Sequence, residues 1–175
     1  MTTFAAPSFR LTLEEAGWAI LDVVLGDDTL RIDRISYLTA ALDDLLVAGL
    51  HLSFGYWQET VTFDNEGWRT ELRFTTEWID RPEPIGDDGI YADPRLRVSV
   101  VELDRGEEKL LLTGLCETRD VVAAALLEVG ENVWSELGAE EYDRRWISSG
   151  FPNRALDALR ASLAVQPCEG REDRE

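Results

Sequence analysis

The sequence predicts an α+β protein, in which helices pack on one face of a mainly antiparallel β-sheet and the C-terminal third is helical. Three observations support this class. Residues 56–64 and 68–78 alternate apolar and polar side chains, which is the period of a half-buried strand. Glycine- and aspartate-rich turns separate the apolar runs of the first 115 residues. Residues 118–163 instead repeat apolar side chains at helical spacing. Strands followed by a run of helices are typical of the α+β class.

The length of 175 residues fits one domain. We expect residues 1–166 to form a single α+β domain. Residues 167–175 combine charged side chains with proline and glycine, and they predict a flexible C-terminal tail.

The N-terminal part predicts a hairpin followed by a helix. Residues 11–32 contain two apolar runs separated by Gly26 and two aspartates, which supply turn chemistry. Asp33 is a candidate N-cap, because its carboxylate can accept from the unpaired backbone donors of a first turn. The expected helix ends at Gly49 and carries one apolar stripe, formed by Ile35, Leu38, Leu42, Leu45 and Leu46.

The clearest strand pair is 56–64 with 68–78, joined by a short turn that ends at Gly67. One face of the second strand is apolar and is expected to be buried; its large members are Trp68, Leu72, Phe74 and Trp78. The other face alternates arginine and glutamate, and we expect ion pairs between strands on a solvated surface, made by Arg69, Glu71, Arg73 and Glu77.

Residues 80–95 predict a long loop, because three prolines and two glycines interrupt a polar stretch. Two further strands, 96–103 and 110–115, follow it and form a hairpin around residues 104–107. Their apolar runs favour central strands covered on one face by helices.

The remainder predicts three helices. Thr118 can cap a helix whose apolar stripe comprises Val122, Leu126, Val129, Val133 and Leu137. Gly138 is expected to end it, and a short helix with Tyr142 and Trp146 one turn apart follows. Phe151 and Pro152 then introduce a final helix, with an apolar side made by Leu156, Leu159 and Leu163.

Charge limits the classes of partner. The chain has 17 basic and 35 acidic residues, a net charge of −18. Such a chain repels phosphates, so we expect no direct contact with nucleic acid or anionic membranes and instead a partner with a basic surface. The first residues lack a basic leader, no apolar run reaches the length of a membrane helix, and the two cysteines, Cys116 and Cys168, show no motif spacing. These features predict a cytoplasmic protein.

The residues that carry chemistry are sparse. The single histidine, His51, has no partner visible in the sequence and is interpreted as structural. No nucleophile motif or phosphate-binding loop is present, and one histidine with two distant cysteines does not make a zinc site. Asp87, Asp88 and Asp93 lack the ligand spacing of a calcium loop. We therefore expect no catalytic, cofactor-binding or metal-binding residues, and binding is favoured over catalysis.

The C-terminal region resembles a known class of proteins. Its pattern is Val133-Trp134, Gly138, Tyr142, Trp146, Phe151-Pro152, Leu156 and Leu159. Together with the small acidic α+β build, residues 118–163 resemble the cytoplasmic immunity proteins of bacterial polymorphic-toxin systems. The resemblance implies a non-enzymatic protein that binds a cognate toxin and blocks its active site. It implies no particular binding residues.

Three functional hypotheses remain open. The first is an immunity-type protein whose acidic surface meets the cationic cleft of a toxin. The second is a small enzyme or metabolite-binding domain with a pocket between sheet and helices. The third is a DNA mimic, although arginines interrupt its negative surface. For the first, the candidate partner-binding residues are acids on helix faces and loops plus the aromatic pair most expected to be exposed: Asp43, Asp44, Tyr56, Trp57, Asp87, Asp88, Glu140 and Glu141.

Overall fold

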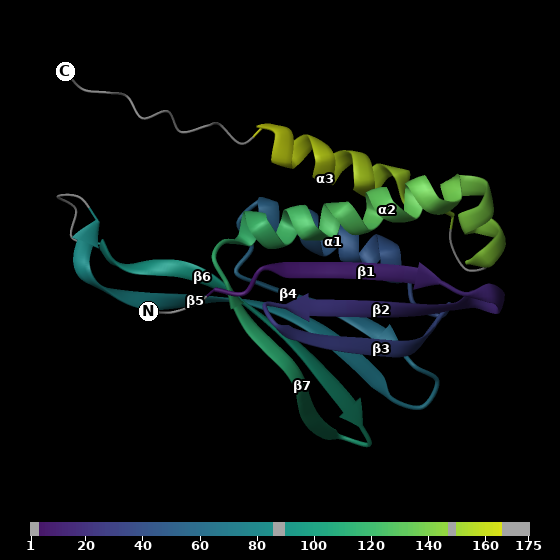
Figure 1. Cartoon of the computed structure of the whole chain (residues 1–175), viewed down its shortest axis with the longest axis horizontal. Helices are drawn as coiled ribbons and strands as arrows, with labels where there is room; N and C mark the ends of the chain where they lie inside the picture. Colours follow the sequence, from purple (N-terminus) through teal and green to yellow (C-terminus); the bar gives the residue numbers. More distant parts are fainter. Residues whose placement is uncertain (1–3, 86–89, 147–149, 166–175) are drawn as a thin grey trace.

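The computed structural model describes residues 4–85, 90–146 and 150–165. It confirms the α+β class, with antiparallel strands and three helices that lie together on one side of the strands (Figure 1). The strands form two sheets, one of three strands and one of four. The predicted tail at 167–175, including Cys168, lies outside the described residues, as do Asp87 and Asp88.

The three-stranded sheet has the order β1 (Pro7–Leu13), β2 (Trp18–Leu25) and β3 (Asp28–Ser36), all antiparallel. A short 3-10 turn (Glu15–Gly17) joins β1 to β2. The turn at Gly26 joins β2 to β3, as the sequence predicts.

The helix predicted from Asp33 begins later. Strand β3 continues through Ile35 to Ser36, and helix α1 spans Ala41–Ser53, with no side-chain cap at its start. Ile35 is therefore buried in the core as a residue of strand β3. Its seven-residue separation from Leu42 equals two helical turns only by coincidence. Gly49 lies inside α1 and does not end it.

The four-stranded sheet has the order β4 (Gln58–Asp64), β5 (Arg69–Ile85), β6 (Ile90–Asp104) and β7 (Glu107–Cys116). Every neighbouring pair is antiparallel. Both predicted hairpins, 56–64 with 68–78 and 96–103 with 110–115, are confirmed. Strand β7, expected to be central, lies at the edge of the sheet.

The long loop predicted at 80–95 is wrong for the residues described there. Strands β5 and β6 continue through it and extend together beyond the rest of the molecule as a two-stranded arm (Figure 1). The amide of Thr76 donates to the Trp57 carbonyl, on the β4 side of β5. Backbone amides alternate along a strand, so the amide of Trp78 also points toward that side and away from β6. Its partner Pro94 belongs to the same non-hydrogen-bonded pair, so the Pro94 nitrogen points away from β5. Pro94 thus removes no hydrogen bond between the two strands, which is why a strand tolerates it.

The C-terminal helices follow the prediction closely. Helix α2 spans Arg119–Arg145, and the Thr118 hydroxyl caps it by accepting from the Val121 amide at 3.2 Å. The backbone of α2 leaves helical geometry at Gly138, where the sequence predicts that one helix ends and another begins. Helix α3 spans Asn153–Val165 and follows Phe151 and Pro152.

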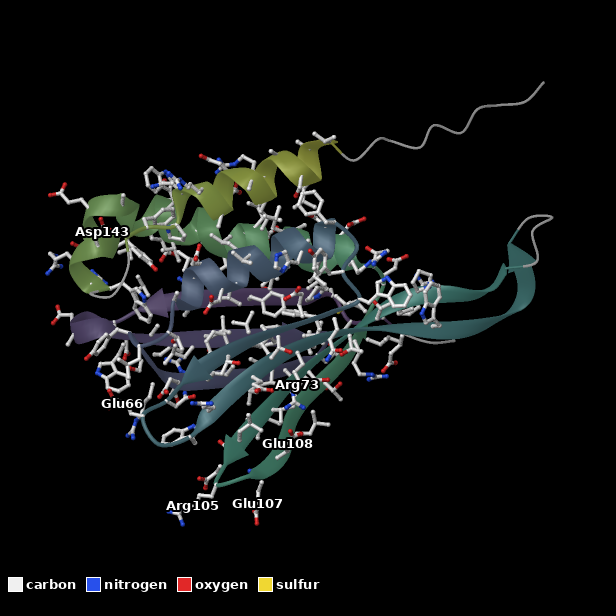
Figure 2. The ribbon with its side chains drawn as sticks, turned by 180° about the vertical axis from the view of Figure 1, so that it is seen from behind. Glu66, Arg73, Arg105, Glu107, Glu108 and Asp143 are labelled. Atoms are coloured by element: carbon white, nitrogen blue, oxygen red, sulfur yellow. The ribbon has the colours of Figure 1, made fainter. Side chains whose placement is uncertain are left out.

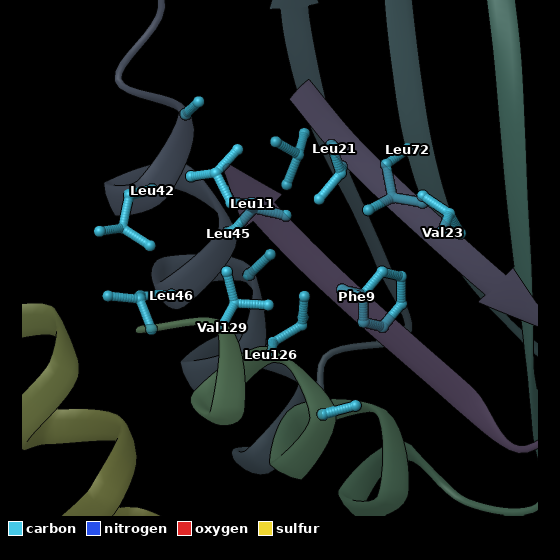
Figure 3. Close-up of a cluster of buried hydrophobic side chains, with 14 of the residues drawn as sticks. Phe9, Leu11, Leu21, Val23, Leu42, Leu45, Leu46, Leu72, Leu126 and Val129 are labelled. Atoms are coloured by element: carbon cyan, nitrogen blue, oxygen red, sulfur yellow. The ribbon is translucent and has the colours of Figure 1, made fainter. Parts of the chain in front are cut away.

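The core is one cluster of buried side chains contributed by both sheets and all three helices. Figure 3 shows leucines of α1 and residues of α2 facing the inner sides of β1 and β2. Six of the residues expected to be buried are so: Leu42, Leu72, Phe74, Val122, Leu126 and Leu156. The expectation is wrong for three residues: Leu38 is 64% exposed because it lies in the turn before α1, Trp78 is 55% exposed on β5, and Trp68 is half-buried just before β5.

Replacing Leu42 by alanine should lower the free energy of unfolding by about 2–5 kcal/mol, because it removes apolar contacts and leaves a cavity. Leu38→Ala should change it by less than about 0.5 kcal/mol, since that side chain is exposed. Urea unfolding of both variants measures the difference. Equal losses at the two positions would contradict the assignment of the core.

Candidate functional site

The most conspicuous surface feature is a group of four exposed aromatic side chains, Phe54, Tyr56, Trp57 and Trp78, which we call the aromatic patch. Each is between 52% and 68% exposed. Three of them lie in the segment that joins α1 to β4, and Trp78 lies on β5. Exposed aromatic side chains gathered in one place indicate an interaction surface, because burying them against a partner is strongly favourable.

The patch exists because the buried face of the four-stranded sheet continues past the ends of α1 and α2. Leu72, Phe74 and Thr76 alternate on the inner face of β5, and Trp78 follows them two residues later. The register of β4 with β5 places Trp57 opposite Thr76 on the same face. Both tryptophans therefore face inward where no helix covers them.

Contacts within the chain hold these rings in place. The Trp57 and Trp78 rings pack edge to face, with centroids 6.2 Å apart. Tyr56 stacks on His51, the last basic residue of α1, at 4.6 Å. His51 Nδ1 lies 2.8 Å from the Glu59 carboxylate on β4. The sequence-based interpretation of His51 as structural agrees with this position, because His51 links α1 to β4 and supports Tyr56.

A pocket of about 330 Å³ lies beside the patch, between the end of α1, the start of α2 and the inner face of β5 and β6. Its lining includes Ser53, Thr76, Pro94, Arg95 and Arg119, and it does not include His51. The Thr76 hydroxyl oxygen is buried and has no hydrogen-bond partner. A buried polar atom without a partner is uncommon and points to a missing ligand or water.

The described acidic residues proposed as partner-binding lie at one end of the helical layer, and part of their charge is paired. Asp43 and Asp44 lie half-buried in the first turn of α1. Glu140 and Glu141 lie near the end of α2, and both of these helix ends border Phe151, since Asp43 lines a hollow with it and Asp143 accepts from its amide at 2.8 Å. Arg144 and Arg145 both bind the Glu141 carboxylate, which lowers the pKa of Glu141 to about 2 and neutralises it locally. Of this set, Glu140 is exposed.

The outer face of the four-stranded sheet carries the ion pairs predicted for it. Arg73 on β5 makes a bidentate pair with Glu108 on β7, at 3.0 and 3.1 Å, and also binds Glu71 (Figure 2). Arg97 on β6 binds Glu77 on β5. These pairs satisfy the charges within the chain, so this face is a solvated surface and not the binding site.

Sequence analysis found half of the aromatic patch. Tyr56 and Trp57 were candidate partner-binding residues, and their exposure is confirmed. Phe54, Trp78 and the pocket with Arg119 were missed. One signal was present: the strand that carries Trp78 extends beyond the start of its predicted partner strand at residue 56, so no residue of that strand lies directly opposite Trp78.

The residues that resemble the immunity proteins are mainly core residues. Val133, Tyr142, Trp146, Phe151, Leu156 and Leu159 are buried, and Tyr142 and Phe151 pack edge to face at 5.2 Å. Trp134 is 45% exposed and leans on Phe151. This motif therefore contributes packing, and it presents one aromatic side chain at the surface.

Among the described residues, no group of three or more histidine, cysteine or acidic side chains is arranged to hold a metal ion. No described helix has both the length and the apolar character needed to span a membrane. Searches against protein-family models, curated proteins and solved structures gave no match.

Asp44→Asn should stabilise the protein at neutral pH. Burial, and then the neighbouring Asp43, raise the pKa of Asp44 above its usual value of 3.8, so the folded state disfavours the charged form. The free energy of unfolding of the wild type should consequently fall relative to that of Asp44→Asn as pH rises from 3.8, the usual pKa, through the raised pKa of the folded state. Below pH 3.8 the Asp44 carboxyl is neutral in both states, so the pH-dependent difference between the two proteins should vanish. Urea unfolding of both proteins between pH 3 and 7 measures this. Glu128→Gln, on the exposed side of α2, is the control for loss of one charge; an equal gain there would contradict the assignment.

Proposed function

We propose that this chain is a non-enzymatic protein-binding domain of the immunity type, which neutralises a cognate bacterial toxin by covering part of it with the aromatic patch. The observation that carries the proposal is the exposure of Trp57 and Trp78 on an uncovered part of an otherwise buried sheet face, with Phe54 and Tyr56 exposed in the adjoining segment between α1 and β4. Tryptophan and tyrosine are the side chains that most often dominate the energy of protein interfaces.

The charge of the chain supports a toxin with a basic surface. A net charge of −18 attracts cationic proteins over several ångströms and accelerates their association. Asp43, Asp44, Glu140 and Glu141 lie at the opposite end of α1 from the aromatic patch, so they act through the overall field. We accordingly assign specific contact to the aromatic patch and long-range attraction to the acidic residues, and we place both in the cytoplasm.

Two other functions have weaker support. A small enzyme or metabolite-binding domain would need convergent catalytic groups in its pocket, and His51 is instead engaged by Glu59 and Tyr56 beside the pocket. A DNA mimic would need a uniformly negative surface. Arg73 and Arg97 interrupt that surface on the outer face of the sheet.

Co-expression with a toxin-like domain taken from a neighbouring gene tests the proposal. The wild-type chain should restore growth and co-purify with the toxin domain. The double variant Trp57→Ala/Trp78→Ala should bind at least about 30-fold more weakly, because the loss of even one dominant tryptophan contact costs about 2 kcal/mol. Its circular dichroism and Tm should stay close to those of the wild type, since both side chains are largely exposed.

Leu110→Ala provides the matched control. Leu110 is exposed on the edge strand β7, away from the aromatic patch. Its replacement removes exposed apolar surface without touching the proposed interface, so protection and affinity should be unchanged. Full protection by the double tryptophan variant, or the absence of any complex with the toxin domain, would contradict the proposal.

A further inference from the structure

We infer that the pocket beside the aromatic patch receives a carboxylate of the partner, carried by an acidic side chain that apolar residues flank in the partner's sequence. This inference rests on the proposed protein-binding function and specifies the chemistry of the segment that is bound. Its basis is the charge and hydrogen-bonding capacity of the pocket together with the aromatic surface next to it.

The pocket has a positively charged lining in a chain that is strongly acidic overall. Arg95 and Arg119 both line it, with one acid, Asp120. Arg119 donates from Nη1 to the Gly55 carbonyl at 2.5 Å, which fixes its guanidinium group at the rim. Among the described residues, no hydrogen bond uses Nε or Nη2 of Arg119, so these donors remain available for a carboxylate.

Arg95 is also held in position. Its Nη1 donates to the Glu117 carbonyl at 2.9 Å, and its guanidinium carbon lies 4.5 Å from the centre of the Phe4 ring. These contacts hold the Arg95 guanidinium beside Glu117, the residue next to Thr118 of the pocket lining. The first turn of the long helix α2, at residues 119 and 120, adds the positive end of a helix dipole to the same lining.

Thr76 lines the pocket, and its hydroxyl oxygen is buried and lacks a partner. A hydroxyl can donate to a carboxylate oxygen, and a rotation of the Thr76 side chain toward the pocket would give its hydroxyl such a partner. The same lining offers no comparable acceptor for a cationic ligand apart from Asp120, which already takes part in another interaction.

The surroundings favour a protein segment over a free carboxylate. Trp57 and Trp78 lie on the same sheet face as Thr76, and Pro94 both lines the pocket and pairs with Trp78. A partner segment that places an acidic side chain in the pocket would bring its neighbouring residues onto these apolar side chains. The arrangement therefore fits an acidic residue with apolar neighbours.

Panning a phage-displayed library of random 12-residue peptides against the immobilised full chain tests the inference. Enriched peptides should contain aspartate or glutamate next to apolar residues. Arg119→Gln should weaken their binding at least about tenfold, because the positive charge and the guanidinium donors are lost. Arg105→Gln is the matched control: Arg105 lies in the β6–β7 turn, at the other end of β6 (Figure 2), and binding should be unchanged.

The outcomes separate this inference from the proposed function. Enrichment of peptides without acidic residues, equal binding to Arg119→Gln and wild type, or no enrichment would overturn the carboxylate site, whereas neutralisation of the toxin could still stand. If free N-acetylaspartate displaces bound peptide as effectively as the peptides themselves do, the pocket binds a small carboxylate. That result would overturn the inference that it binds a protein segment. If analytical ultracentrifugation shows a wild-type dimer that Trp57→Ala converts to a monomer, a second copy of this chain covers the aromatic patch. That result would overturn the acidic partner segment as its occupant.

Discussion

The close packing of three helices at two glycines is the constraint on which the rest of the structure depends. A Cβ atom on Gly49 of α1 would lie 2.9 Å from a methyl group of Leu159 on α3 and 3.2 Å from Leu126 on α2. A Cβ atom on Gly130 of α2 would lie 2.8 Å from Leu156 and 2.9 Å from Leu46. Because side chains are absent at these two points, α1, α2 and α3 approach closely enough to share one buried cluster.

The extent of this helical layer determines what remains exposed. Helix α1 ends at Ser53 and α2 begins at Arg119, both beside the pocket, while β5 and β6 continue well past them. The inward side chains of the sheet are buried up to Phe74, and they emerge into solvent at Trp78. The aromatic patch and the pocket are thus two consequences of one mismatch in length between the helices and the strands.

Hydrophobic periodicity predicts most of the fold because most elements keep one period along their whole length. Strands β4 and β5 alternate strictly, and α2 repeats its apolar residues over several turns, so each element has one consistent interpretation. The prediction fails where one residue type fits two structural roles. Glycine commonly ends helices, yet Gly49 lies inside α1 and allows α2 and α3 to approach closely. Ile35 fits the spacing of a helical apolar stripe, yet it lies in strand β3.

The site was less predictable than the fold because it depends on where helices end relative to strands. Trp78 continues the apolar face of its strand, and sequence alone interprets that face as buried. The pairing of Glu141 was equally hidden: the sequence shows an acidic residue, and the structure shows that Arg144 and Arg145 both bind its carboxylate. Exposure and pairing of this kind arise from tertiary contacts that a single sequence does not display.

Hydroxyl-radical footprinting of the chain, free and bound to the proposed toxin partner, tests the central claim most directly. The oxidation rate of a side chain reports its exposure, so Trp57 and Trp78 should be oxidised readily in the free chain and protected in the complex. Trp134, exposed on α2, is the internal control and should keep its rate. Protection of Trp134 with unchanged oxidation of Trp57 and Trp78 would contradict the account, because the partner would then cover the helices and leave the aromatic patch open.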